Sequence, residues 1–206
     1  MIAHDIEQGT EEWLKLRSGM PTASCFSKLI TSTGKQSESL CGYAITLAGE
    51  LYAGKPLESF EGNAYTERGK ALEDEARKMY TFLSGTSPEI IGFVTDDAAT
   101  YGCSPDSIID GDGLLEIKCL KAENHIKALL YYRKHGKCPP DYIQQTQGQI
   151  FVCERDWCDL FFYNENLPCL TIRQHRNETI IHALFDQIQN VIVERDRVLK
   201  EIQEFN

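Results

Sequence analysis

Ser104-Pro105-Asp106, followed by Gly113-Leu114-Leu115-Glu116-Ile117-Lys118, places an aspartate, a glutamate and a lysine in the order Asp-x9-Glu-x-Lys. Glu116 and Lys118 are two residues apart, so on a β-strand their side chains point to the same face. Hard cations such as Mg²⁺ prefer carboxylate oxygens, and one or two carboxylates with a substrate phosphate are enough to bind them. Asp106 and Glu116 are therefore candidate metal ligands. Lys118 is a candidate for orienting or deprotonating water, or for neutralising a phosphate, and the whole pattern indicates phosphodiester hydrolysis.

The geometry of this stretch depends on the turn between two predicted strands, 100–109 and 114–120. The intervening Asp110-Gly111-Asp112-Gly113 is typical of a hairpin turn. A loop with an odd number of residues places Asp106 on the same face as Glu116 and Lys118, whereas an even-numbered loop places it on the opposite face. A three-residue loop at 111–113, or a bulge before it, therefore satisfies the site. The alternative is a hairpin whose charged face is simply exposed to water.

Apolar periodicity and turn signals predict a mixture of helices and strands. The strongest helix is 66–83, where apolar residues recur at helical spacing. The order of elements predicts a mixed α/β fold with a central sheet flanked by helices, in one domain spanning 1–206. The other predicted helices are 9–18, a short one capped by Thr22 or Ser24, 39–54, 123–135, 141–152 and 178–204; the other strands are 89–95, 157–163 and 169–175.

Composition and charge restrict the class of protein. The chain has 206 residues and a formal net charge of −10. It contains no apolar run near the roughly 20 residues that a membrane span needs, and its first residues lack the pattern of a signal peptide, so we expect a cytoplasmic protein that does not enter a membrane. A nucleic-acid ligand needs local positive charge. The segment 118–137 offers this, with six lysines and arginines against the single acid Glu123, although a solvated helix face explains the same charges.

The eight cysteines are scattered and include no Cys-x-x-Cys pair. This spacing argues against a structural zinc site and against a clustered iron–sulfur centre. Several lie in apolar runs, so we expect buried free thiols in a reducing compartment.

Two further residues sit beside apolar helix faces. Glu73 flanks the apolar stripe of the helix 66–83, where it either lies at the boundary with solvent or points at a positive group. Gln147 lies between Ile143 and Ile150 on the inward face of its helix, which favours a buried hydrogen-bonding role.

Four blocks in this order resemble the phage lambda exonuclease type, the YqaJ-like viral recombinases of the PD-(D/E)xK nuclease superfamily. Together they extend from about residue 9 to 165 and imply the restriction-endonuclease-like fold of that superfamily. The blocks are Trp13-Leu14-Lys15-Leu16-Arg17 through Thr22-Ala23-Ser24; Arg68-Gly69-Lys70 with Glu73; Ser104-Pro105-Asp106 to Glu116-Ile117-Lys118-Cys119; and Tyr142-Ile143-Gln144-Gln145-Thr146-Gln147.

The resemblance implies roles for individual residues. Asp106 and Glu116 match metal-binding acids, and the backbone carbonyl of Ile117 and the carboxylate of Glu73 match further ligands. Lys118 matches the catalytic lysine. The remaining matches are Gln145, which corresponds to a glutamine that helps to position the site, and Arg17, Ser24 and Ser104, which correspond to a pocket for the DNA 5′-phosphate. Arg17 suits that pocket because a guanidinium binds two phosphate oxygens at once.

The implied activity is a Mg²⁺-dependent 5′→3′ exonuclease that acts on ends of double-stranded DNA, with two Mg²⁺ ions that Mn²⁺ can replace. It leaves 3′ single strands for annealing-type recombination. The resemblance also implies a phage-type recombination protein, a toroidal homotrimer and a partner single-strand annealing protein. Two alternatives remain open: a restriction-type endonuclease of the same fold, and a non-catalytic protein that binds DNA ends.

Overall fold

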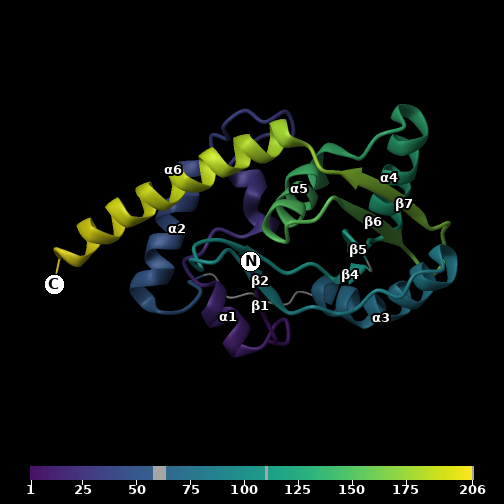
Figure 1. Cartoon of the computed structure of the whole chain (residues 1–206), viewed down its shortest axis with the longest axis horizontal. Coiled ribbons are helices and arrows are strands. Elements are labelled where there is room, and N and C mark those ends of the chain that lie inside the picture. Colours follow the sequence, from purple (N-terminus) through teal and green to yellow (C-terminus); the bar gives the residue numbers. More distant parts are fainter. Residues whose placement is uncertain (58–63, 110, 206) are drawn as a thin grey trace.

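The computed structural model describes residues 1–57, 64–109 and 111–205. A four-stranded sheet runs in the order β4-β5-β6-β7 (Figure 1). Its central strands β5 and β6 are parallel, whereas β4–β5 and β6–β7 are antiparallel. The predicted mixed α/β class is confirmed. The strands are β4 (Ser107–Ile109), β5 (Gly113–Cys119), β6 (Trp157–Tyr163) and β7 (Leu170–His175).

A second, three-stranded sheet joins β1 (Ile2–His4), β2 (Phe93–Thr95) and β3 (Gly102–Cys103). The single predicted strand 100–109 is wrong, because β3 and β4 belong to different sheets. Pro105 lies between them, and a proline has no N–H to continue a ladder of hydrogen bonds. The predicted strand 89–95 is likewise shortened to β2, and β1 was not predicted at all.

The helices agree with the sequence prediction to within two residues at most ends. The 141–152 helix is divided, because Pro140 starts a short 3₁₀ turn before the α-helix proper. The bounds are α1 (Glu11–Arg17), the 3₁₀ helix η1 (Ala23–Lys28), α2 (Leu40–Ala53), α3 (Ala64–Ser84), α4 (Ala122–His135), the 3₁₀ helix η2 (Pro140–Tyr142), α5 (Ile143–Val152) and α6 (Glu178–Gln203). In the part of the chain that the structure describes, no helix is both long enough and apolar enough to cross a membrane.

The predicted apolar stripe of α3 is only partly buried. Ala76 and Tyr80 are buried, and the Tyr80 ring packs edge-on against Phe161 of β6 with 5.4 Å between centroids. Met79 and Leu83, in contrast, are 37% and 57% exposed. Figure 1 shows α3 along one side of the four-stranded sheet, so only one edge of the helix meets the sheet.

The cysteines are free thiols, and the prediction of burial holds for half of them. Four are buried, three are partly buried, and the eighth, Cys41, is exposed. Two buried thiols, Cys103 of β3 and Cys153 at the end of α5, have sulfur atoms 3.4 Å apart. The contact ties the small sheet to α5.

The register of the hairpin gives the odd-numbered loop that the predicted site requires. Ile109 pairs with Gly113, which leaves three residues between the paired positions, an odd number. The loop is 110–112 rather than the predicted 111–113, because Gly113 already belongs to β5; residue 110 lies outside the described residues. Continuing the register by one residue beyond Ser107 and Leu115 sets Asp106 opposite Glu116, on one face of the sheet.

A close approach between α5 and η1 brings the N-terminal part of the chain to the sheet. Gly148 of α5 faces Phe26 of η1, and a Cβ added at Gly148 would lie 2.4 Å from the Phe26 ring. Phe26 is fully buried, so its ring has little room to move. The absence of a side chain at position 148 thus sets how near η1 comes to α5.

We predict that Gly148→Ala lowers the free energy of unfolding by about 1–3 kcal/mol, because the added methyl overpacks this contact. Gly42→Ala in α2 is the matched control, since a Cβ there meets nothing within 4 Å and alanine favours a helix. Urea unfolding of both variants measures the difference. Equal stability of the two variants would contradict the close packing of α5 on η1.

Candidate active site

Glu116 lies at the centre of the site, on the central strand β5. Its side chain is buried, with a relative exposure of 4%. Its Oε1 atom accepts hydrogen bonds from Lys118 Nζ and from Gln145 Nε2, each at 2.6 Å. Its Oε2 atom accepts one from Gln149 Nε2, also at 2.6 Å. Because a buried carboxylate is costly unless it is paired, these donors from β5 and α5 stabilise the charge.

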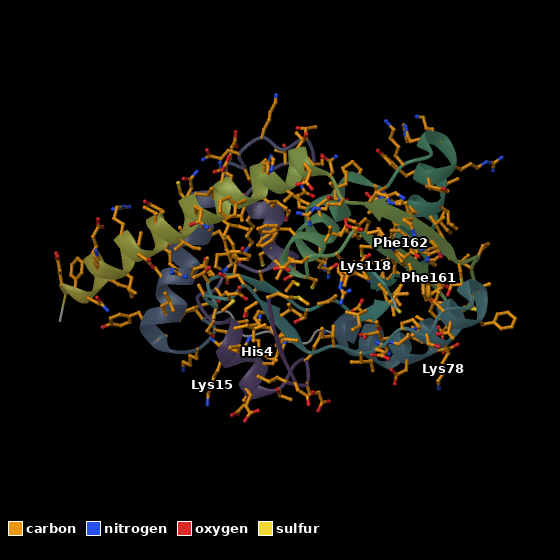
Figure 2. The ribbon with its side chains drawn as sticks, viewed as in Figure 1. His4, Lys15, Lys78, Lys118, Phe161 and Phe162 are labelled. Carbon is orange, nitrogen blue, oxygen red and sulfur yellow. The ribbon has the colours of Figure 1, made fainter. Side chains whose placement is uncertain are left out.

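Gln145 connects the glutamate with the lysine. Its Oε1 accepts a hydrogen bond from Lys118 Nζ at 3.0 Å, while its Nε2 donates to Glu116. One amide therefore orients both charged groups. Figure 2 labels Lys118 amid the side chains between the sheet and α5.

Asp106 completes the acidic pair. Its Oδ2 accepts a hydrogen bond from the backbone N–H of Ile117 at 2.5 Å. Burial, together with the nearby carboxylates of Glu116 and Glu73, raises the pKa of Asp106 well above its usual range. The repulsion between these acids is the kind of energy that a bound cation relieves.

Lys118 keeps its proton in this environment. Burial by itself lowers the pKa of the ammonium group, but the Glu116 carboxylate, in ion-pair contact, and Asp106 outweigh it, so the pKa is raised above its ordinary value. The group is therefore a hydrogen-bond donor and a positive charge at neutral pH.

Glu73 approaches the pair from α3 but is held by an arginine. Arg77 donates to Glu73 Oε1 at 2.6 Å, to Ser107 Oγ at 3.0 Å and to the carbonyl of Asp106 at 3.4 Å. Burial raises the pKa of Glu73 even with Arg77 beside it. Arg77 thereby joins α3 to the start of β4, and it sets where Glu73 lies relative to Asp106.

The donor set fits a hard divalent cation in its chemistry. Asp106, Glu116 and the carbonyl of Ile117 provide oxygen atoms, which Mg²⁺ prefers, and Mg²⁺ keeps several waters when only one or two carboxylates bind it. Within residues 1–57, 64–109 and 111–205, no three His, Cys, Asp or Glu side chains converge as one metal-binding group. The contribution of Glu73 to a metal site thus stays a prediction.

The second part of the site is a pocket around Arg17. The guanidinium lies 4.2 Å from the centre of the Trp13 ring and donates to Thr22 Oγ1 at 3.2 Å and Ser24 Oγ at 3.4 Å. Trp13 Nε1 in turn donates to Ser104 Oγ at 2.9 Å. Trp13 therefore contacts both the arginine and the serine, although Ser104 lies 91 residues further along the chain than Trp13.

One cleft of about 210 Å³ joins the two parts. The cleft is lined by both the Arg17 pocket and the acidic pair, and Ser104 connects them because it lies two positions before Asp106. Sequence-predicted residues on its wall are Arg17, Ser24, Ser104, Asp106, Glu116 and Gln145. Lys118 reaches the same place through its contacts with Glu116 and Gln145.

Sequence reasoning assigned no role to Trp13, Arg77 or Gln149. Each lies one helical turn from a predicted site residue on the same helix: Trp13 before Arg17, Arg77 after Glu73 and Gln149 after Gln145. Side chains four residues apart share a helix face. That spacing is a signal that was present in the sequence.

Gln147 has the buried role that its position predicts. It is 3% exposed; its Nε2 donates to the carbonyl of His175, and its Oε1 accepts from the N–H of Asn177. The residue therefore connects α5 to the segment between β7 and α6 and points away from the cleft.

The basic segment 118–137 includes α4. Arg133, Lys134 and Lys137 are exposed, whereas Lys127 is paired with Glu123 at 2.6 Å on the surface of the helix. A DNA-facing role for this segment stays a prediction.

Comparison with known proteins identifies the chain. The family model of the YqaJ-like viral recombinase domain matches residues 12–156. The chain belongs to this family. The matched range includes every predicted site residue of the YqaJ-like domain, from Arg17 to Gln145. No protein with a curated description matches the chain significantly.

Solved structures agree with the YqaJ-like assignment. The crystal structure of the alkaline exonuclease LHK-Exo from Laribacter hongkongensis is 29% identical, with a TM-score of 0.82 over 95% of this chain and 97% of that one. The same enzyme in complex with dAMP is 30% identical over the same shares. A phage-related exonuclease from Haemophilus somnus 129PT shares the fold at 18% identity and a TM-score of 0.71, over 89% of this chain and 96% of that one. The predicted family and its PD-(D/E)xK-type fold are confirmed.

We predict that Arg77→Met lowers the free energy of unfolding by about 1.5–3 kcal/mol, the range for hydrogen bonds to charged groups, because Glu73, Ser107 and the Asp106 carbonyl lose their shared donor. Lys78→Met is the control: it changes the next residue of α3, which is exposed and points away from the ribbon in Figure 2. Urea unfolding without divalent cations measures both. A loss of stability in the Lys78 variant as large as in the Arg77 variant would contradict this role.

Proposed function

We propose that this protein is a Mg²⁺-dependent exonuclease that digests the 5′ strand of linear double-stranded DNA in the 5′→3′ direction. Membership of the YqaJ-like family and the likeness to an alkaline exonuclease support a DNA exonuclease. The observation that carries the finer proposal is the single cleft, in which an arginine pocket and an acid–lysine group lie side by side. An exonuclease needs this arrangement, because it must recognise a chain end next to the bond that it cuts.

The Arg17 pocket has the chemistry of a terminal phosphate site. A guanidinium and two hydroxyl groups, Ser24 and Ser104, provide donors for a dianion. Trp13 holds the arginine against its ring and the serine at its indole N–H, so the donors are in place before a ligand arrives. A 5′-phosphate bound there places the next phosphodiester toward Asp106 and Glu116 and sets the polarity of digestion.

Mg²⁺ would be held by Asp106, Glu116, the Ile117 carbonyl and Glu73. We expect two ions, which Mn²⁺ could replace. Such ions lower the pKa of bound water and stabilise charge on the phosphoryl oxygens. The lysine and the glutamine belong to the protein's own part of the reaction. Lys118, as an ammonium group, neutralises charge on the phosphate and orients the attacking water. Gln145 holds Lys118 and Glu116 in position relative to each other through its hydrogen bonds to both.

The reaction is a hydrolysis in which water attacks phosphorus and the bond to the 3′ oxygen of the terminal nucleotide breaks. The products are a 5′-mononucleotide and a strand one nucleotide shorter, with a new 5′-phosphate. The new end has the chemistry that the Arg17 pocket recognises, so each cut regenerates the substrate and leaves a growing 3′ single strand.

We further propose the assembly that the family suggests: a toroidal homotrimer around DNA, working in phage-type recombination with a single-strand annealing protein that receives the 3′ strand. Sedimentation of the purified chain tests the trimer. A monomer at all concentrations with full activity would contradict it.

A restriction-type endonuclease and a non-catalytic end-binding protein remain the alternatives. Covalently closed circular duplex separates the first, because an enzyme that needs an end leaves it intact. Tight binding to ends without hydrolysis in Mg²⁺ or Mn²⁺ would favour the second.

For the catalytic group, we predict that Glu116→Gln and Lys118→Met each reduce Mg²⁺-dependent digestion of linear duplex by roughly 10²–10⁴-fold, the usual effect of losing a group that acts in the transition state. Single-turnover release of labelled mononucleotide is the measurement. Lys200→Met is the control, since that ammonium group is exposed on α6, outside both the cleft and the basic segment. Unchanged rates in both site variants would refute the assignment.

For the phosphate pocket, we predict that the wild type prefers a 5′-phosphorylated end over a 5′-hydroxyl end and that Arg17→Met removes most of this preference. The expected change is about 10–100-fold, because a charged hydrogen bond contributes about 1.5–3 kcal/mol. Labels on each strand show which one shortens. Digestion from the 3′ end would overturn the polarity. A preference that survives in the variant would overturn the assignment of the pocket.

A further inference from the structure

Gln149 makes an unusual contact for a buried glutamine of α5. Its side chain is 1% exposed, and its Nε2 donates to Glu116 Oε2 at 2.6 Å. The two other buried glutamines of the helix bind backbone instead: Gln144 donates to the carbonyl of Ile30, and Gln147 to that of His175. Gln149 thus directs its amide to a charged group on the wall of the cleft.

The two carboxylate oxygens of Glu116 accept different numbers of hydrogen bonds. A carboxylate oxygen has two acceptor positions. Oε1 accepts from Lys118 Nζ and Gln145 Nε2, which fills it, whereas Oε2 accepts from Gln149 alone among the hydrogen bonds of the described residues. One acceptor position therefore remains on Oε2, the oxygen that Gln149 holds.

A thiol fixes which way the Gln149 amide faces. Cys158 of β6 is fully buried, and its sulfur lies 3.9 Å from Gln149 Oε1, to which the thiol donates. Burial raises the pKa of Cys158 well above its usual range, so the sulfur keeps the proton that it donates. With its oxygen turned to a donor, the amide presents its N–H group to Glu116.

We propose that Gln149 is a positioning residue that holds Oε2 of Glu116 as the one atom with which this carboxylate binds a divalent cation. The inference rests on the proposed function, which places the cation at Glu116. Hydrogen bonds to ligating carboxylates orient the ligand, and their loss typically costs 10–100-fold in metal affinity. Without Gln149 the carboxylate is held only at Oε1, by Lys118 and Gln145, and the position of Oε2 toward a cation is no longer set.

The test uses Mn²⁺ binding to the DNA-free full-length protein, followed by electron paramagnetic resonance. Gln149→Met removes the donor and keeps the volume of the side chain. Its Kd for Mn²⁺ is expected to rise by roughly 10–100-fold. Gln147→Met is the matched control, two residues along the same helix: it also loses buried hydrogen bonds and lowers the urea midpoint, but its Kd for Mn²⁺ should stay within about twofold of the wild type.

Kinetics give a second readout that a merely structural role would not move. In Gln149→Met the Mg²⁺ concentration for half-maximal digestion should rise by the same factor as the Kd, while kcat at saturating Mg²⁺ falls less. Gln149→Asn serves if the methionine variant does not fold, because it keeps the amide but is one methylene too short to reach Oε2; the same rise in Kd is expected.

Glu116→Gln separates the possible failures. If it loses Mn²⁺ binding while Gln149→Met binds like the wild type, the positioning role is overturned and the proposed function stands. If wild type and Glu116→Gln bind Mn²⁺ equally, the metal site of the proposed function is wrong, and the inference falls with it. A rise in Kd for Gln147→Met as large as for Gln149→Met would also overturn the inference, because the effect would then come from loosened packing of α5.

Discussion

The negative charge of Glu116 is buried on the central strand of the sheet, and the rest of the site is arranged to neutralise it. An unpaired carboxylate at this depth would be very costly. The ion pair with Lys118 and the amides of Gln145 and Gln149 meet that requirement together. Two of these donors come from α5, so the charge holds this helix against the sheet. Through the tight contact at Gly148, α5 in turn sets the position of η1, which contributes Ser24 to the Arg17 pocket.

The same arrangement leaves an unfavourable interaction in place. Asp106 lies opposite Glu116 in the hairpin, and the repulsion of the neighbouring acids, added to burial, raises the pKa of Asp106. A protein selected only for stability would replace one of the two acids. Keeping both is consistent with a site that is completed by a cation, whose charge turns the repulsion into attraction. Functional sites are where such local conflicts are expected.

Much of the fold was readable from local patterns. Helix ends followed from apolar periodicity and capping, and strand alternation predicted the common face of Glu116 and Lys118. The sequence left open whether Asp106 shares that face, and the register Ile109–Gly113 decided it. The errors have physical causes. The stretch 100–109 has strand-forming residues at both ends, but Pro105 between them cannot donate to a ladder of hydrogen bonds, and the two halves join different sheets. Met79 and Leu83 have the right spacing for burial on α3, yet only one edge of that helix meets the sheet. Periodicity shows which residues share a face and not how much of that face is covered.

By itself, the sequence determined the chemistry of the acid–lysine strand and the common face of Glu116 and Lys118, because alternation along a strand depends only on neighbouring residues. The face of Asp106 depended on the parity of the hairpin loop, which the pairing of β4 with β5 decided. It also determined the family, through short blocks whose order is visible without coordinates. Only the tertiary structure decided that the Arg17 pocket and the acid–lysine group share one cleft. Trp13 and Ser104, which join the pocket to the acids, are 91 residues apart in the chain, and no local pattern encodes that contact. Trp13 of α1 is buried beside Phe93 of β2, and Ser104 follows β3, which pairs with β2. The contact therefore depends on apolar burial and strand pairing, which act over distances in space rather than along the chain.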